Sequence, residues 1–518
     1  MVSYSGTNNQ VEGVDEADTV KTDGTFLYVG SWRDVRIYRA YPPDRAGLVS
    51  TLSFPGYVRG LFVNDGRLVV LWSSVHDLGN RTLAYATHAH IIDVSWPDSP
   101  VLERNVTVVA RYIAARMIRD QVYLVAGSYV YGPDARLLLP ILYDDGVRTD
   151  LRASEVGYFP DSRDSRQFAI VLGFDLERED RPRYAVFLAA EMTEVYVSGK
   201  NVYLAGFWGW SGPTTWIHKI SISESLVCYV ASAEVPGYFL NQFSMDEFQG
   251  HLRVATTARP TWGGPSENNV YVLNRTMVRV GTLEGLAPGE TIYSARFLGE
   301  RAYLVTFKKI DPLFVIDLSD PAEPRVLGYL KIPGYSDYLH PYDQDHVIGL
   351  GKDTYDMGTF AWYQGVKVSL FDVSDVEHPQ EESKLVIGDR GTESTALREH
   401  KAFLFVPAKG LLVLPIDLRL VNRTRVPNPP PETYGELAWQ GAYAISIRPD
   451  EEMTVVGRVA HNPGPGCPSA DPYELWYGCR SYTVQRSLYI GDVLYTISGE
   501  WIVLSDFDTI AEIRRIPA

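Results

Sequence analysis

The chain has 518 residues, 45% of them hydrophobic and 12% aromatic, which is typical of a folded protein with a large apolar core. Its formal net charge is −16 and it has no long run of Lys or Arg, so nucleic acid is excluded as an expected partner. No stretch of about 18 or more uncharged apolar residues is present, so no transmembrane segment is predicted.

Short apolar runs separated by turn residues recur along the whole chain, and almost none of it follows the period of an amphipathic helix. The sequence therefore predicts an all-β protein. The best-defined element is a strand introduced by a polar turn. Such strands are predicted at residues 26–30, 67–72, 122–127, 202–206, 252–256, 302–306, 347–351, 411–416 and 493–498.

Each of these strands has an apolar partner before the turn and usually two after it, as in residues 60–110. Four antiparallel strands per repeat are typical of a propeller blade, and blades bury their faces by stacking in a ring. We therefore predict a single β-propeller domain over residues 1–518, with an N-terminal arm at 1–14. We count nine blades, with eight as the alternative if residues 111–190 hold a weak repeat or an insertion. The N- and C-terminal segments are expected to close the ring.

Two recurring markers support the repeat. The triplet Pro-Gly-Tyr occurs at residues 55–57, 236–238 and 333–335, where we expect one blade to cross to the next. An aspartate that ends an apolar run is followed seven residues later by proline at Asp93/Pro100, Asp175/Pro182, Asp317/Pro324 and Asp372/Pro379. This spacing fits a capped turn between the third and fourth strands, so both markers are interpreted as structural.

Long connections rich in Pro, Gly, Asp and Tyr are the candidate partner contacts, because loops on a rigid scaffold commonly carry specificity. They lie at about residues 129–166, 352–364, 417–436 and 461–480. A second set of candidates is aromatic: Trp208, Trp210, Trp262 and Trp362 are able either to form a sugar-binding platform or to pack against neighbouring blades.

Modifications are predicted from sequons and cysteines. Four N-x-[ST] sequons favour an exported glycoprotein, at Asn80, Asn105, Asn274 and Asn422. Cys467 and Cys479 flank a Pro/Gly-rich loop and are a candidate disulfide, whereas Cys228 lies in an apolar run and is expected to be a buried thiol. The first residues lack the features of a signal peptide, so the protein is expected either to be cytosolic or to be exported with a leader absent from this sequence.

Several motifs resemble those of archaeal and bacterial secreted proteins with a C-terminal β-propeller domain distantly related to WD40 repeats. The opening motif is Val11-Glu12-Gly13-Val14-Asp15-Glu16-Ala17-Asp18-Thr19-Val20-Lys21-Thr22-Asp23-Gly24. Further matching stretches lie at residues 332–341, 367–374, 387–391 and 400–403, so the resemblance covers nearly the whole chain. It implies a propeller fold and export, and it implies no particular reaction.

These motifs also contain most of the clustered polar residues. On predicted first strands, such residues are able to converge and hold a divalent cation, with oxygen ligands favouring Ca²⁺ or Mg²⁺ and Ca²⁺ as the named candidate. The metal candidates are Asp15, Glu16, Asp18, His340, Asp389, Glu393 and His400. The alternative is that these carboxylates pair with basic residues and hold the blades in register.

We predict a secreted or cell-surface scaffold that binds through its loops and is not an enzyme. Its partner is expected to be a surface protein, a glycan or another copy of the chain. The alternative is an extracellular, glycan-directed hydrolase, since glycoside cleavage needs only two suitably separated carboxylates. A propeller-capped peptidase is disfavoured because the chain has no Gly-x-Ser-x-Gly motif.

Overall fold

The computed structural model describes residues 2–78, 83–130, 138–158, 167–177, 180–189, 191–208, 214–259, 263–307, 311–358, 360–464 and 479–518. The chain divides into two compact units. Unit 1 comprises Met1–Asn8, Phe243–Val272 and Val280–Ala518, and unit 2 comprises Asn9–Gln242 and Leu273–Arg279. Whether residues 1–518 act as one domain stays a prediction.

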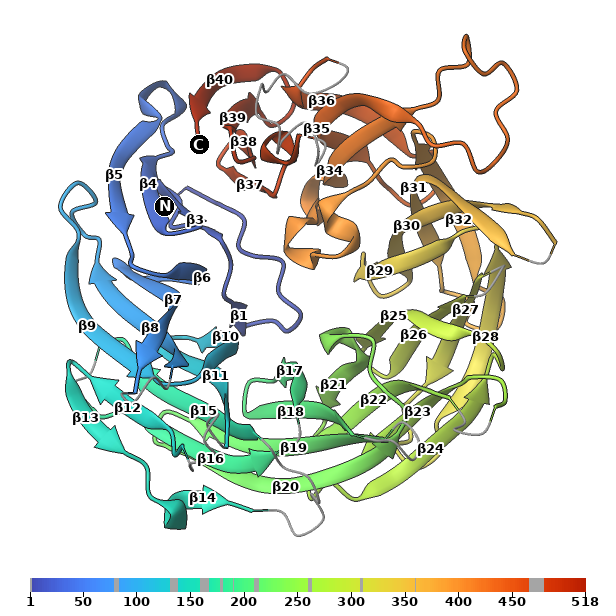
Figure 1. The fold of residues 1–518 in the computed structure, drawn as a ribbon. Coiled ribbons are helices and arrows are strands. Elements are labelled where there is room, and N and C mark those ends of the chain that lie inside the picture. The colour runs from blue at the N-terminus through green and yellow to red at the C-terminus, as the bar shows by residue number, and fades with distance from the viewer. Residues whose placement is uncertain are drawn as a thin grey trace. The chain divides into compact units, whose positions relative to one another are not determined.

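Unit 2 contains the first four blades, coloured blue to green in Figure 1. Blade 1 consists of β2 (Val20–Thr22), β3 (Phe26–Ser31), β4 (Asp34–Arg39) and β5 (Gly47–Ser53). Blade 2 consists of β6 (Tyr57–Asn64), β7 (Arg67–Asp77), β8 (Leu83–Asp93) and β9 (Val101–Val108), extended by β12 (Ile141–Asp144) and β13 (Val147–Asp150). Blade 3 consists of β10 (Arg111–Ile118), β11 (Gln121–Tyr129), β15 (Gln167–Asp175) and β16 (Arg183–Ala189), extended by β1 (Asp15–Glu16) and β14 (Val156–Gly157). Blade 4 consists of β17 (Met192–Val197), β18 (Asn201–Trp208), β19 (Thr214–Ser223) and β20 (Leu226–Pro236).

Unit 1 contains the other five blades, apart from the hairpin tip of blade 5. Blade 5 consists of β21 (Met245–Phe248), β22 (His251–Ala258), β23 (Glu267–Leu273) and β24 (Arg279–Leu286). Blade 6 consists of β25 (Thr291–Leu298), β26 (Arg301–Phe307), β27 (Asp311–Asp317) and β28 (Arg325–Ile332). Blade 7 consists of β29 (Tyr335–Pro341), β30 (His346–Asp356), β31 (Ala361–Asp372) and β32 (Gln380–Ile387). Blade 8 consists of β33 (Leu404–Val406), β34 (Leu411–Leu420), β35 (Glu436–Ser446) and β36 (Thr454–Asn462), and blade 9 of β37 (Arg486–Ile490), β38 (Val493–Ile497), β39 (Trp501–Asp506) and β40 (Glu512–Pro517).

The only helical elements among the described residues are short 3₁₀ turns. These are η1 (Pro43–Arg45), η2 (Ala153–Glu155), η3 (Gln242–Ser244), η4 (Thr395–Leu397), η5 (His400–Ala402), η6 (Pro407–Lys409) and η7 (Arg480–Tyr482). Within the ranges that the structure covers, no helix has the length and apolar character needed to cross a membrane.

The nine four-stranded blades confirm the predicted all-β propeller and its blade count. Residues 111–190 are not a weak repeat, because they form the complete blade 3. The extra length in this region is an insertion between β11 and β15. Its hairpin β12–β13 continues the sheet of blade 2, and β14 adds in parallel to β16 of blade 3. The insertion therefore covers the outer edges of two blades, which limits unwanted strand pairing there.

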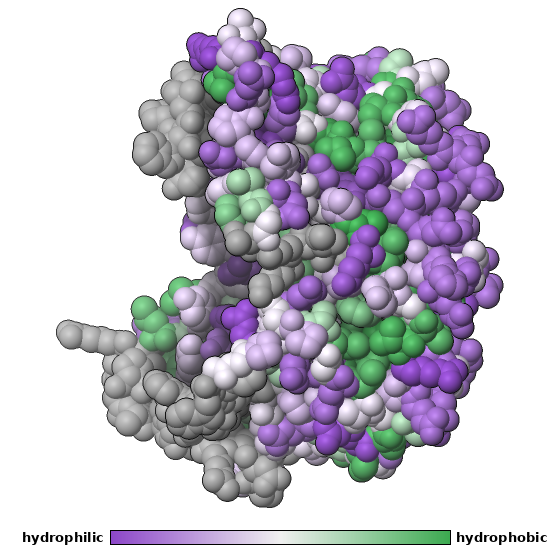
Figure 2. Space-filling view, turned by 90° about the vertical axis from the view of Figure 1, so that its right-hand side faces the viewer, coloured by the Kyte–Doolittle hydropathy of each residue, from purple (hydrophilic) through white to green (hydrophobic). Residues whose placement is uncertain are grey.

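The core lies between successive blades within each unit. In unit 2, Phe62 and Val108 of blade 2 pack with Leu124 of blade 3. In unit 1, Leu350 of blade 7 packs with Leu414 of blade 8. Middle strands such as β15 are buried throughout, whereas the fourth strand β40 is largely exposed. In the view of Figure 2, the surface is accordingly mostly hydrophilic, with patches of hydrophobic residues between the hydrophilic ones.

Both sequence markers have the predicted structural roles. Pro-Gly-Tyr lies at the exit from β5, β20 and β28, where the chain leaves one blade. Gly334 has a φ of +98°, and a Cβ there would lie 2.8 Å from the carbonyl oxygen of Lys352, so this crossing requires glycine. The four marker aspartates end β8, β15, β27 and β31. Each of them accepts a hydrogen bond from the backbone N–H two residues later, which caps the turn.

The two ends of the chain pair within unit 1. Tyr4 forms an antiparallel bridge with Ile490 at the end of β37. The N–H of Gly491 donates to the Ser3 carbonyl at 2.7 Å, and the N–H of Ser5 donates to the Tyr489 carbonyl at 3.1 Å. The N-terminal arm thus adds a short strand to the first strand of blade 9, in agreement with the predicted pairing of the two terminal segments.

Candidate functional site

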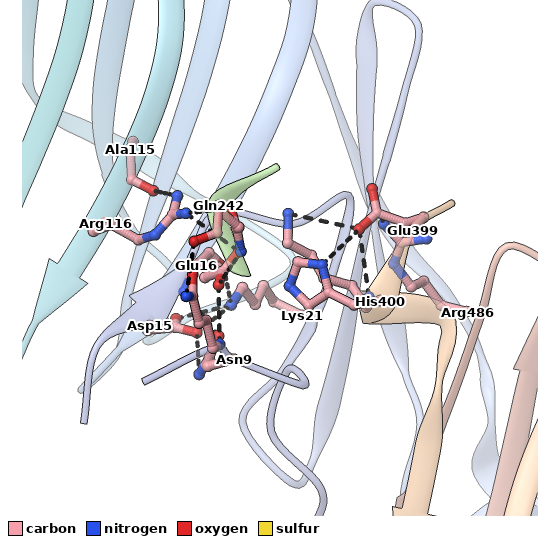
Figure 3. A network of polar contacts seen from close by, with 12 residues as sticks. Asn9, Asp15, Glu16, Lys21, Ala115, Arg116, Gln242, Glu399, His400 and Arg486 are labelled. Atoms are coloured by element: carbon pink, nitrogen blue, oxygen red, sulfur yellow. Dashed lines mark hydrogen bonds and ion pairs between the residues drawn. The ribbon is translucent and has the colours of Figure 1, made fainter. Parts of the chain in front are cut away.

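The opening motif forms a buried polar network in unit 2 (Figure 3). β1 pairs with β10 so that Glu16 lies opposite Arg116, and the two nearly fully buried side chains form an ion pair of 3.4 Å. Glu16 also accepts hydrogen bonds from the side-chain amide of Gln242 and from the backbone N–H of Gln10, each at 3.0 Å. A buried carboxylate with this many donors is satisfied as an anion. Glu16 therefore anchors the N-terminal segment to blade 3.

The neighbouring aspartates are also engaged. Lys21 donates to Asp15 at 2.7 Å and to the carbonyl of Glu16 at 2.8 Å. Asp18 forms a backbone bridge with Leu61 of β6, and its side chain accepts from the N–H of Thr19 at 2.7 Å. These contacts fit the alternative interpretation of the motif, in which its charges hold strands in register.

The two candidate histidines lie in an aromatic cluster of unit 1. His340 shares a hydrogen bond of 3.1 Å with the Tyr338 hydroxyl, and its ring lies 4.8 Å from that of Phe403. Burial, with a smaller effect of Arg296 and of His400, lowers the pKa of His340 to about 3, so this imidazole is neutral at pH 7. The ring of His400 meets Phe243 edge to face at 4.9 Å. Both histidines therefore pack against aromatic rings in the core of unit 1.

The remaining two candidates, Asp389 and Glu393, lie on the link from blade 7 to blade 8, and each pairs with a basic residue. Asp389 pairs with Arg423 at 3.1 Å and accepts from the N–H of Val421 at 2.7 Å. Glu393 pairs with the buried Lys352 at 3.1 Å. Across the described ranges, no group of three or more His, Cys, Asp or Glu is placed to hold a metal ion. The structure thus gives the seven metal candidates no shared site, and the possible calcium ion stays a prediction.

Two of the predicted contact loops, 352–364 and 417–436, come together in unit 1. We call the surface that these loops form with Arg390, which follows β32, the loop platform. It consists of Tyr355, Phe360, Trp362, Tyr363, Arg390 and Tyr434. The hydroxyls of Tyr363 and Tyr434 share a hydrogen bond of 2.5 Å although the residues are 71 positions apart. The amide of Gln364 donates to the Pro431 carbonyl at 2.9 Å. These contacts fasten the β30–β31 hairpin of blade 7 to the β34–β35 loop of blade 8.

Arg390 is the centre of the loop platform. Its guanidinium carbon lies 4.3 Å from the ring centroids of Trp362 and Tyr363 and 4.4 Å from that of Tyr434. The side chain is only 4% exposed, and the Tyr434 hydroxyl is the hydrogen-bond acceptor of its Nη2 at 3.2 Å. The Nε and Nη1 atoms have no hydrogen-bond partner among the described residues. Three aromatic faces therefore solvate this cation, an arrangement that is strong when water is excluded.

Hydrogen bonding from Tyr363 and Arg390 lowers the pKa of Tyr434, while the same tyrosine contact raises the pKa of Tyr363. Rings held this way keep fixed positions, because any rotation breaks a cation–π contact or the shared hydrogen bond.

Beside the loop platform lies a carboxylate that the sequence analysis did not single out. Asp337 is the extra residue of a β-bulge in β29, the first strand of blade 7, and bulges re-aim side chains near functional sites. Burial raises the pKa of Asp337 to about 7, an effect that Lys352 opposes and Glu393 reinforces. Lys352 lies opposite Tyr335 on β30 and also donates to the carbonyl of Thr392. Asp337, Lys352 and Glu393 therefore form one charged cluster.

A surface cavity of about 940 Å³ lies in unit 2, between β12–β13 and blade 3. A second surface cavity of about 550 Å³ in unit 2 is lined in part by Glu155, Gly157 and Tyr158 of the 129–166 connection. Of the three arginines in the wall of the 940 Å³ cavity, Arg104 donates to both carboxylate oxygens of Asp144 at 2.8 Å and to the carbonyl of Asp180. Arg67 pairs with Glu103 at 2.9 Å. We assign the cavity no ligand.

The predicted sequons lie in different environments. Asn422 is exposed in a turn, and its Oδ1 accepts from the N–H of Thr424 at 3.1 Å. Asn274 accepts from the Thr276 hydroxyl at 2.9 Å in a tight turn. Asn105 is half-buried on β9. Asn80 lies outside the described residues, and glycosylation of all four stays a prediction.

The cysteine predictions have mixed outcomes. Cys479 is disulfide-bonded and fully buried, while its predicted partner Cys467 lies outside the described residues. Cys228 is a free thiol and is exposed, so the expectation of a buried thiol is wrong. The physical reason is its place on β20, the fourth strand of blade 4, where only alternate residues such as Val227 face the core.

Of the aromatic candidates, only Trp362 has a described side chain. Trp210 and Trp262 lie outside the described residues, as does the side chain of Trp208. The sequence pattern missed Tyr434 and gave no role to Arg390 in binding. Their contacts depend on the docking of two blades, and the nearest signal was that both surrounding loops are long, the first with Tyr355 and Tyr363 and the second with the prolines at 427 and 429–431.

Comparison with known proteins agrees with the fold. A family model described as a β-propeller domain matches residues 4–510. The uncharacterized protein MJ1554 of Methanocaldococcus jannaschii is 30% identical over 489 residues, covering 80% of this chain and 74% of that protein. An uncharacterized protein of Archaeoglobus fulgidus is 26% identical over 486 residues, covering 80% and 75%. Among solved structures, Hsv2p of Kluyveromyces lactis aligns with a TM-score of 0.35 at 9% identity, over 89% of this chain and 98% of that chain.

Proposed function

This chain belongs to the β-propeller domain family, and on that premise we propose that it is a secreted or cell-surface module that binds a partner through its loops and catalyses no reaction. The observation that carries the proposal is the loop platform. Two loops from different blades are fastened around one buried arginine, so their rings are held in fixed positions. Fixed, partly exposed aromatic side chains are typical of binding surfaces, since little entropy is lost when a partner docks.

The polar residues favour binding over catalysis. Glu16 and Asp15 in unit 2 are each paired with a cation, and Glu393 in unit 1 is paired with Lys352. Carboxylates committed in this way are poor nucleophiles or bases. Export is part of the proposal and is supported by the disulfide-bonded Cys479, since disulfides persist in oxidising compartments.

A glycan-directed hydrolase is the second candidate, and the observation that favours it is Asp337. A carboxyl whose burial raises its pKa to about 7 has the proton affinity of a general acid at neutral pH. Release of reducing sugar from envelope polysaccharide, abolished by Asp337→Asn, would favour the hydrolase. Binding without release of sugar would favour the scaffold.

The binding proposal is tested by removing one exposed ring. Tyr434 on the loop platform and Tyr329 on β28 are both 57% exposed, so they are a matched pair. Binding of purified protein to envelope preparations of the source organism is measured for wild type, Tyr434→Ala and Tyr329→Ala. We expect Tyr434→Ala to bind about tenfold more weakly, the typical effect of losing an interface tyrosine. If both variants bind as wild type does, the loop platform is not the binding surface.

A further inference from the structure

We infer that the loop platform binds a neutral glycan, an inference that rests on the binding function proposed above. The first observation is the exposure of its rings. Tyr355, Phe360 and Tyr434 are 54%, 45% and 57% exposed, although they are large aromatic side chains. The C–H faces of a pyranose ring carry partial positive charge, and they stack on the negative face of an aromatic ring. Exposed rings on neighbouring loops therefore offer stacking positions for successive sugars.

The second observation is that two of these rings, Phe360 and Tyr434, are held in place before any ligand arrives. Phe360 meets Trp362 edge to face at 5.2 Å, and Trp362 in turn lies over Arg390. The Arg390 carbonyl also accepts from the N–H of Gly435, which fixes the backbone beside Tyr434. Sugars make weak individual contacts, so a glycan site gains most from a surface that loses no freedom on binding.

The third observation is the set of polar groups around the rings. Glu393 is 43% exposed and Arg398 is 86% exposed at the side chain, and they lie 4.0 Å apart. Glu393 lies close enough to Tyr363 and Tyr434 to affect the ionisation of both. Sugar hydroxyls are both donors and acceptors, so a carboxylate beside a guanidinium matches them in both roles.

Charge decides between the classes of ligand. The centre of a protein–protein interface is depleted in Glu, Asp and Lys, whereas Asp337, Glu393 and Lys352 lie together beside these rings. The chain also carries a net charge of −16, which repels acidic polysaccharides. A neutral glycan suits both facts, and a protein partner becomes an outcome of the test.

The test compares envelope preparations treated with periodate, which cleaves vicinal diols of sugars, or with protease. We expect periodate to reduce wild-type binding at least tenfold and protease to change it less than twofold. If protease abolishes binding and periodate does not, the partner is a protein; the glycan inference then fails, while the binding function stands. If neither treatment nor Tyr434→Ala changes binding, both proposals fail.

Two further variants separate loss of contact from loss of folding. Tyr434→Phe keeps the ring but removes the hydroxyl that bonds Tyr363 and Arg390. We expect it to keep most of the periodate-sensitive binding lost in Tyr434→Ala. Arg398→Gln removes an exposed charge with little structural effect, and we expect it to weaken binding two- to fivefold at an unchanged melting temperature. Wild-type binding by Arg398→Gln together with no binding by Tyr434→Phe would overturn the assignment.

Discussion

Glu194 provides a direct test of the packing in unit 2. It lies on β17, next to a β-bulge in the first strand of blade 4. Burial alone raises the pKa of this carboxyl from 4.5 to about 7. The folded chain therefore holds the proton more tightly than the unfolded chain does. The stability that the protonated group contributes is fully present below pH 4.5 and is lost as the pH rises through about 7.

Replacing Glu194 by Gln removes the buried charge and keeps the shape. One pKa unit corresponds to about 1.4 kcal/mol, so the rise from 4.5 to about 7 predicts that Glu194→Gln is more stable than wild type by about 3–4 kcal/mol at pH 9. Near pH 4 the two proteins should be equally stable. For a chain of 518 residues, the entropy of unfolding converts this difference into a rise of about 3 °C in melting temperature.

The assay is thermal and urea unfolding of both proteins between pH 4 and 9. Glu234→Gln is the matched control, because Glu234 is an exposed glutamate on β20 of the same blade. It should show no gain that grows with pH. Equal stability of Glu194→Gln and wild type at pH 9, or an equal gain at pH 4 and pH 9, would refute the argument that burial sets this carboxyl's proton affinity.

Two further predictions concern the N-terminal segment. Glu16→Ala leaves the buried Arg116 without its carboxylate and should reduce the free energy of unfolding by about 3–5 kcal/mol, whereas Glu16→Leu combined with Arg116→Leu should recover much of the loss. Urea unfolding measures the stability of both variants, and an unchanged stability of Glu16→Ala would contradict the buried ion pair. Deletion of residues 2–8 removes the pairing of Ser3 and Ser5 with blade 9 and the hydrogen bond from Asn8 to the His400 carbonyl at 2.8 Å; we expect a loss of about 2–5 kcal/mol, and wild-type unfolding of the truncated protein would show that the arm is dispensable.

The fold was largely predictable because each blade repeats the same local pattern. A polar turn, an apolar strand and an aspartate-capped turn recur in the sequence. In the structure, the polar turn leads into the second strand of a blade, and the aspartate-capped turn joins the third strand to the fourth. Errors arose where one local signal has two meanings. The apolar run around Cys228 fits both a buried middle strand and a half-exposed fourth strand. Its place on the fourth strand β20 is what exposes the thiol. Similarly, residues 111–190 seemed irregular because an insertion interrupts a regular blade.

The candidate site was predictable only in part, because its contacts join distant positions. Length and composition singled out the loops at 352–364 and 417–436, which the structure brings into contact, and their role in partner binding stays a prediction. Their connection through Arg390 depends on how blades 7 and 8 dock, which no local pattern specifies. The β-bulge that re-aims Asp337 is equally hidden, since its flanking residues fit an ordinary alternating strand.

The distribution of charge explains why the loops, rather than the first strands, are the better candidate for function. The carboxylates of the opening motif are neutralised by Lys21 and Arg116, so removing them should lower stability before it changes any binding. In the loop platform the cation is instead held by aromatic faces, which leaves Glu393 and Arg398 exposed beside the rings. Acidic groups used for internal pairing and aromatic groups at loop tips fit the ligand proposed above, which has hydroxyls and apolar faces. Variants of the opening-motif carboxylates should therefore lose stability, whereas variants of the exposed rings in the loop platform should lose binding.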